Sequence, residues 1–240
     1  MPAFSGAVAA NGLAIFAFLG LLYFFSQYLQ LVREYGPLKA GVAELPSTIA
    51  SMVVILFVGA LVARMGAGRS IGLGLTLGAI GLAGIGMTVS MSAYWGLGIS
   101  LVLLGLGIGI AMTLSTDAVV SAVPTERAGA ASSIAETAYE LGGALGIAVL
   151  GSVHLAMYQS HLDLPAGTDP SDATIAESSL ASTVADVADP VVVDHAQSAF
   201  VSAVQTTSFV AAVILAVSAV VAWRVIPSPR DATVGTHEAH

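Results

Sequence analysis

The sequence contains no cysteine. Disulfide bonds, thiolate metal sites and a cysteine nucleophile are therefore excluded, while the redox compartment stays open. Charged residues are also scarce, at 9% of the 240 residues, whereas a soluble domain carries roughly 25%. The seven Lys and Arg residues form no basic patch, so we do not expect nucleic acid as a partner.

Signatures of enzyme chemistry are missing as well. We find no serine-histidine-acid set, no metal-ligand spacing, no phosphate loop and no H-E-x-x-H. The "GLGIGI" run at 105–110 has the wrong glycine spacing for a dinucleotide fingerprint, and no strand precedes it. We therefore expect no enzyme, no bound cofactor and no metal site.

Long apolar runs dominate what is present. Apolar residues make up 56% of the chain and the mean hydropathy is +0.90. Several runs reach the roughly 20 residues that a helix needs to cross a bilayer. The sequence thus predicts an all-α polytopic membrane protein with six spans, at about 8–32, 42–63, 70–91, 95–120, 128–157 and 198–223.

The basic residues predict the orientation of this single bundle. Five arginines lie on the side of the two termini and only two basic residues on the other, so both termini should be cytoplasmic in the cell membrane. The loop at 159–197 then faces outward and the tail at 224–240 inward. That loop holds seven acids and no Lys or Arg, and its apolar spacing predicts a short surface helix with Ser171 or Asp172 as N-cap and Pro190 as its stop.

Glycines are dense in the third, fourth and fifth spans. They form three G-x-x-x-G pairs, at Gly74 and Gly78, Gly105 and Gly109, and Gly142 and Gly146. Such pairs let helix backbones approach closely in lipid.

Three segments resemble the major facilitator superfamily, and within it the fourteen-helix drug:proton antiporters. "QYLQLVREYGPLKAGVAELP" at 27–46 resembles the link between the first two helices of their C-terminal bundle. "GALVARMGAGR" at 59–69 is similar to the cytoplasmic G-x-L-x-D-R-x-G-R loop, with Ala63 in place of the acid. "AVPTERAGAASSIAETAYELGGALGIAVLG" at 122–151 is similar to the penultimate helix and is the most specific of the three.

This resemblance implies a proton-coupled exporter of lipophilic or quaternary ammonium cations, with the proton as coupling ion. Such transporters place the substrate between two six-helix bundles, and only the C-terminal one is represented here. We therefore expect three partners: the lipid bilayer, cationic drugs or dyes, and either a missing N-terminal bundle or a second copy of the chain.

Two acids in the fifth span are the main candidates for proton or cation binding. Glu136 and Glu140 are one turn apart on one helix face, ~12 and ~18 Å from the helix start at Ala128. Carboxylates at this depth usually face a bundle interior or an aqueous cavity. Burial and a like-charged neighbour favour the protonated form, and an arriving cation favours release. Alternatively, the pair stays protonated and bonds to neighbours such as Ser132, Ser133 or Thr137, or opens to a cytoplasmic vestibule.

Two further acids are weaker candidates for proton or cation binding. Asp117, near the end of the fourth span, is a second proton or cation site or a hydrated acid paired with Arg127. Glu44, before Pro46, either attracts cations at the mouth or pairs with Lys39 on the rim, and the rim role is favoured.

Arginines and aromatic residues complete the candidates. Arg64 and Arg69 flank the tight turn after the second span. They act either as a gating latch that holds one conformation or as anchors that fix the membrane topology. Tyr139 and Phe24 are the best candidates for cation–π contacts in a substrate cavity, although lipid-facing belts also explain such rings. His154 relays protons or is simply hydrated.

Two hypotheses follow. The first is a transporter component, the C-terminal bundle of a multidrug exporter. The second is a non-transporting membrane protein, either an inert remnant or a partner subunit of a split transporter.

Overall fold

The computed structural model describes residues 2–121 and 123–225. Most of the expected tail, including Arg230, lies outside the described residues. In the described part every regular element is a helix: α1 (Pro2–Leu31), α2 (Pro37–Met65), α3 (Ala67–Thr88), α4 (Tyr94–Ser121), the short 3-10 helix η1 (Thr125–Arg127), α5 (Ala128–His161), α6 (Pro170–Ser178), α7 (Leu180–Asp186) and α8 (Pro190–Val225).

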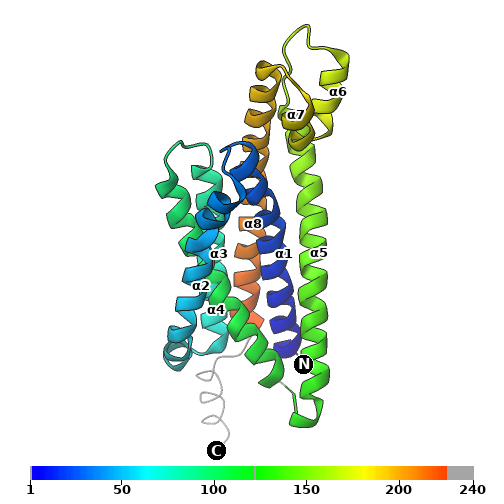
Figure 1. Ribbon diagram of the computed structural model, residues 1–240. Coiled ribbons are helices and arrows are strands. Elements are labelled where there is room, and N and C mark those ends of the chain that lie inside the picture. Colours follow the sequence, from blue (N-terminus) through cyan, green and yellow to red (C-terminus); the bar gives the residue numbers. More distant parts are fainter. Residues whose placement is uncertain (1, 122, 226–240) are drawn as a thin grey trace, which may run out of the picture.

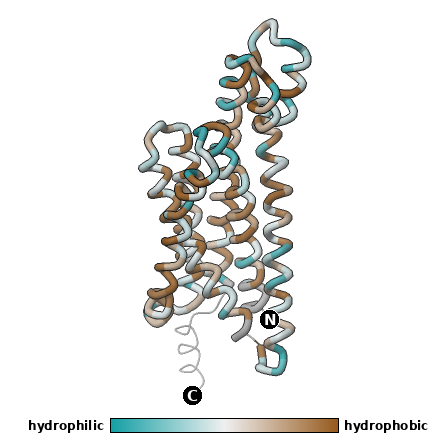
Figure 2. The backbone as a smooth tube through the Cα atoms, viewed as in Figure 1, coloured by the Kyte–Doolittle hydropathy of each residue, from teal (hydrophilic) through white to brown (hydrophobic). Residues whose placement is uncertain are grey.

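Six of the described helices are long and apolar enough to cross a membrane, namely α1, α2, α3, α4, α5 and α8. This confirms the expected all-α polytopic fold. The long helices run side by side, and α6 and α7 form a small cap at one end (Figure 1). Hydrophilic residues gather at this α6–α7 end and brown, hydrophobic stretches line the long helices (Figure 2).

Packing is unequal around the bundle. The closest pairs are α3 with α4, α3 with α8, α1 with α5, and α2 with α4. Helix α2 makes few contacts with α1 or α3, so it is held almost entirely by α4. Helix α5 is held mainly by α1 and α8. Helices α2 and α5 therefore lie at two separate edges, with α1 and α4 between them (Figure 1).

Local sequence sets the turns between the first helices. Pro37 is at the first position of α2, where its missing N–H costs nothing. Gly66 alone separates α2 from α3 and has φ of 82°, a conformation that favours glycine. Pro46 lies inside α2, where it removes one helical hydrogen bond.

The three G-x-x-x-G pairs lie at close helix contacts, as predicted. A Cβ at Gly105 would lie 2.0 Å from the Ser47 carbonyl oxygen, and one at Gly146 would lie 2.2 Å from the Phe16 carbonyl oxygen. A Cβ at Gly107 would lie 2.3 Å from the main-chain nitrogen of Gly78. Glycine is thus what lets α4 approach α2 and α3, and α5 approach α1.

The expected surface helix in the loop is two helices rather than one. Asp169, not Ser171 or Asp172, caps α6, and its Oδ1 accepts from the Ser171 N–H at 2.8 Å. The chain then breaks at Ser179, whose extended backbone and side chain cap α7. Pro190 does not stop a helix but begins α8. Proline at a first helical position explains both starts, at Pro170 and Pro190.

Candidate functional site

The helices differ in how much of their surface the bundle covers. Only 22% of the most apolar part of α2 and 33% of that of α5 is buried, against 61% for α4. Large apolar side chains of α2 are exposed, among them Met52, Leu56 and Phe57. In the described part of the chain nothing covers these faces. They must therefore meet lipid or another protein surface.

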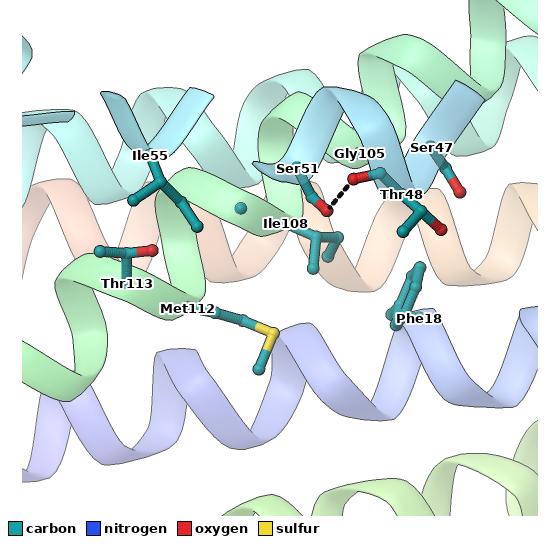
Figure 3. A pocket seen from close by; sticks show the side chains of 10 residues that line it. Phe18, Ser47, Thr48, Ser51, Ile55, Gly105, Ile108, Met112 and Thr113 are labelled. Atoms are coloured by element: carbon teal, nitrogen blue, oxygen red, sulfur yellow. Dashed lines mark hydrogen bonds between the residues drawn. The ribbon is translucent and has the colours of Figure 1, made fainter. Parts of the chain in front are cut away.

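A hollow of about 250 Å³ lies between α1, α2 and α4. We call it the hydroxyl pocket, because four hydroxyl residues line it: Ser47, Thr48, Ser51 and Thr113. Its other walls are apolar or glycine: Phe18, Ile55, Gly105, Ile108, Gly109 and Met112 (Figure 3).

The polar wall of the hydroxyl pocket follows from the sequence of α2. Ser51 follows Ser47 and Thr48 by four and three residues, about one helical turn, so the three hydroxyls lie on the same side of α2. Ser51 Oγ donates to the Thr48 carbonyl oxygen at 2.8 Å (Figure 3). These residues were not among the candidates chosen from the sequence. The signal was the cluster of hydroxyls in an otherwise apolar helix, opposite the Gly105 and Gly109 pair.

Glu136 and Glu140 lie on an exposed side of α5. The opposite, buried side carries Ala135, Gly142 and Gly146 against α1. Two of the three hydroxyls considered as their partners donate to the main chain instead: Ser133 Oγ donates to Gly129 O at 3.0 Å and Thr137 Oγ1 to Ser133 O at 2.8 Å. The two carboxyl groups thus face outward from this bundle, one turn apart.

The other sequence candidates are scattered over the bundle. Asp117 is exposed near the end of α4, and Tyr139 is partly buried beside the two acids. Arg64 and Arg69 are both exposed, on either side of the Gly66 turn. The carbonyl oxygen of Arg69 accepts from Trp223 Nε1 at 3.2 Å, which ties this turn to α8.

Phe24 does not line the hydroxyl pocket. It is buried and stacks on His154, with ring centroids 4.3 Å apart and planes at 17°. His154 also meets Phe200 of α8 edge-on at 4.6 Å. The aromatic residue of α1 that does reach the pocket is Phe18.

His154 differs from the hydrated residue considered above. Its side chain is only 4% exposed, and neither ring nitrogen has a hydrogen-bond partner within residues 2–121 and 123–225. The reason is tertiary: α1 and α8 close over this part of α5 and bring Phe24 and Phe200 onto the ring.

Glu44 also differs from the favoured expectation of a rim residue paired with Lys39. The Lys39 ammonium instead lies over the Tyr35 ring, 3.8 Å from its centroid. The Glu44 side chain is partly buried, and its Oε1 is buried without a hydrogen-bond partner.

Comparison with known proteins identifies the family. The profile of the Major Facilitator Superfamily matches residues 2–147. The chain is 36% identical over 228 residues to the multidrug efflux pump LfrA of Mycolicibacterium smegmatis, covering 92% of this chain and 45% of that protein. The chain belongs to the major facilitator superfamily.

Other relatives carry drug-resistance names too. The methyl viologen resistance protein SmvA of Salmonella typhimurium is 34% identical over 180 residues, covering 75% of this chain and 36% of SmvA. The multidrug resistance protein Stp of Mycobacterium tuberculosis is 36% identical over 157 residues, covering 65% of this chain and 29% of Stp. The similarity is thus to the drug-efflux members. The chain spans less than half the length of these relatives.

Proposed function

We propose that the chain is one six-helix bundle of a proton-coupled exporter of lipophilic or quaternary ammonium cations. The observation that carries this proposal is the pair Glu136 and Glu140, which face outward from α5 at membrane depth. Carboxyl groups are costly in lipid, by ~2.5–3.5 kcal/mol each on insertion scales. A water-filled cavity or a partner surface on that side removes the cost.

The chemistry of this pair is an exchange of positive charges. Two ionised carboxyl groups one turn apart repel each other, and a proton or a cation bound between them relieves this repulsion. A lipophilic cation that arrives between them stabilises the ionised forms, and the proton leaves to water. The proton and the cargo then cannot be bound at the same time. No cofactor other than the coupling proton is needed.

The cargo class is supported by charge and by the relatives. The hydroxyl pocket offers aromatic and apolar surface beside hydroxyls, with Phe18 in its wall. On α5, the partly buried Tyr139 precedes Glu140 in the chain. Methyl viologen, named for one relative, is itself a quaternary dication. Asp117 would serve as an additional cation contact, and Arg64 with Arg69 as the gating turn.

This bundle needs a second six-helix bundle, which would lie opposite the poorly covered faces of α2 and α5. Transporters of this kind enclose their substrate between two bundles. The partner is an N-terminal six-helix bundle, or a second copy of this chain. We place the protein in the cell membrane with its termini in the cytoplasm and the α6–α7 cap outside, from the distribution of Arg and Lys.

A second function is supported by the poorly covered faces of α2 and α5. These faces also fit a partner subunit that works only in a complex, or a non-transporting remnant. In that case the exposed faces of α2 and α5 still bind a partner, but the chain alone moves no cargo.

Ethidium efflux from energised cells tests both proposed functions. The chain is expressed alone and together with the N-terminal half of LfrA, beside Glu140→Gln, Glu136→Gln and the loop control Asp163→Asn, with and without a proton uncoupler. We expect uncoupler-sensitive efflux that Glu140→Gln or Glu136→Gln abolishes and Asp163→Asn retains. Efflux from the chain alone indicates self-pairing, and efflux only with the added half indicates a split transporter. If neither condition exceeds the empty vector while the protein is in the membrane, the transporter proposal fails.

A further inference from the structure

Glu44 of α2 is the acid whose environment stands out in the described bundle. Its Oε1 is buried and accepts no hydrogen bond. Glu136, Glu140 and Asp117, by contrast, have exposed side chains. Glu44 is seven residues into α2, about 10 Å from its start at ~1.5 Å per residue.

Among the residues that the structure describes, no basic group compensates this carboxyl group. On its own helix, Lys39 is turned to the Tyr35 ring. On α1 and the turn after it, Arg33 is bound to the Tyr28 hydroxyl and to the carbonyl oxygens of Met91 and Ser92. The side chain that α1 does offer is the hydroxyl of Ser26.

In the described part of the chain, helix α4 supplies no donor to the buried Oε1 either. Its titratable group at this level is Tyr94, and the Tyr94 hydroxyl donates to the carbonyl oxygen of Ala43 at 2.6 Å. That proton is therefore already used beside Glu44. A carboxyl oxygen that is buried without a donor is far less costly when the group carries its own proton.

Glu44 continues the polar face of the hydroxyl pocket. Ser47, Thr48 and Ser51 follow it at three, four and seven residues, the spacing of one helix face. Ser47 Oγ donates to the main-chain oxygen of Glu44 at 2.9 Å. The carboxyl group thus lies one turn beyond the pocket.

This position is remote from the Glu136 and Glu140 pair. Helix α2 starts at the end of the bundle where Leu31 of α1 accepts from Gln197 of α8 at 2.8 Å, the α6–α7 end (Figure 1). The pair lies nearer the other end, because α5 runs toward the α6–α7 cap from Ala128. The bundle therefore carries acids in both halves of its length.

We propose that Glu44 is a second proton-exchange site, at the α6–α7 end of the hydroxyl pocket. The inference rests on the proposed function and extends it to the other half of the transport path. Glu44 holds a proton when the pocket is empty. When a lipophilic cation occupies the pocket, the O–H bond of the carboxyl group breaks, the proton passes to water, and the carboxylate accepts from Ser26.

Infrared spectroscopy of the purified full chain in lipid nanodiscs tests this site directly. The carbonyl stretch of a protonated carboxylic acid is followed against pH, with and without tetraphenylphosphonium as the cation probe. The variants are Glu44→Gln, Ser26→Ala and Glu34→Gln, the last removing an exposed acid from the neighbouring turn. Circular dichroism checks that each variant is folded.

We expect a carboxylic-acid band that Glu44→Gln removes and that Glu34→Gln leaves in place. Ser26→Ala should keep this band but weaken its response to the probe, because the Glu44 carboxylate then lacks the Ser26 hydroxyl. We also expect the probe to reduce this band in the wild type. A wild-type spectrum without a band sensitive to Glu44→Gln overturns the proposal, and so does a Glu44 band that neither pH nor the probe changes. If Glu44→Gln does not fold, the response of the band to the probe in Ser26→Ala decides instead, and a response equal to that of the wild type overturns the proposal.

The two proposals fail in different ways. A Glu44 band that titrates and responds to the probe, in a protein that shows no efflux with either partner, overturns transport but supports the site. Efflux without any Glu44 band supports transport but overturns the Glu44 site.

Discussion

The Tyr28 hydroxyl donates to the main-chain oxygen of Val89 at 2.6 Å, which joins the last turn of α1 to the end of α3. Tyr28 is 1% exposed, and its hydroxyl also accepts from Arg33 Nε at 2.5 Å. Arg33 in turn binds the carbonyl oxygens of Met91 and Ser92. Two residues thus hold the α1–α2 turn against the α3–α4 turn.

Tyr28→Phe tests this connection. The change leaves the buried Val89 oxygen without its donor and the Arg33 Nε without its acceptor, so we expect a loss of about 1–3 kcal/mol in the free energy of unfolding. Tyr23→Phe is the control, because Tyr23 is 52% exposed and should change stability little. Equal midpoints in denaturant titrations of the two variants in detergent would count against the connection.

Gly105→Ala should separate α4 from α2. The added Cβ would meet the Ser47 carbonyl oxygen at 2.0 Å, and main chain cannot move aside as a side-chain end can. We expect a destabilisation of about 1–3 kcal/mol, the usual cost of overpacking, together with a widened hydroxyl pocket.

Gly59→Ala is the matched control for that change. A Cβ there meets nothing within 4 Å, so helix propensity should leave it neutral or stabilising by up to ~1 kcal/mol. Thermal unfolding followed by circular dichroism measures both variants. If Gly105→Ala is as stable as Gly59→Ala, the close contact of α2 with α4 is not required.

The absence of cysteine makes accessibility measurements clean, because each introduced thiol is the only one. We expect Glu140→Cys, in cells that also express the partner bundle, to react with a water-soluble maleimide and to be protected by ethidium. Leu145→Cys should react slowly. It is also exposed on α5 but points about 140° away at ~100° per residue. Equal labelling of the two, with no protection, would show that no aqueous cavity faces Glu140.

Helix α6 should open in acid. Ser171 donates to Asp169 Oδ1 through its hydroxyl at 2.6 Å and its N–H at 2.8 Å, and these bonds hold the pKa of the Asp169 carboxyl below its usual range. The cap therefore stabilises α6 above the unfolded pKa of about 3.9, and this stabilisation disappears as the pH falls through the lower folded pKa.

Hydrogen exchange of the amides at 170–178 measures this opening. We expect protection at neutral pH that is lost in strong acid. Asp169→Asn should keep the cap, since asparagine is also a good N-cap, and should remove this part of the pH dependence. Asp169→Ala should expose α6 at every pH. An identical acid response in Asp169→Asn would assign the opening to another group.

The sequence predicted the features that depend on short stretches of chain. Six membrane helices follow from the length and hydropathy of each run, and both are local properties. The close contacts at Gly105 and Gly146 were also predictable, because a missing Cβ is what permits backbone approach in lipid. The split of the loop helix at Ser179 was missed, because its serines and aspartates offered several caps and propensity alone does not rank them.

What surrounds each side chain was decided by tertiary structure. From the sequence, Glu44 and His154 read as a rim acid and a hydrated histidine. Their burial depends on where α1, α4 and α8 pack against these two side chains. The residue spacing along α2 or α5 does not predict this packing. The hydroxyl pocket was hidden for the same reason, because it needs Phe18, Ser51 and Thr113 from three helices. Hydropathy places a residue in the membrane, but only the packing of helices determines whether its polar atoms find a partner.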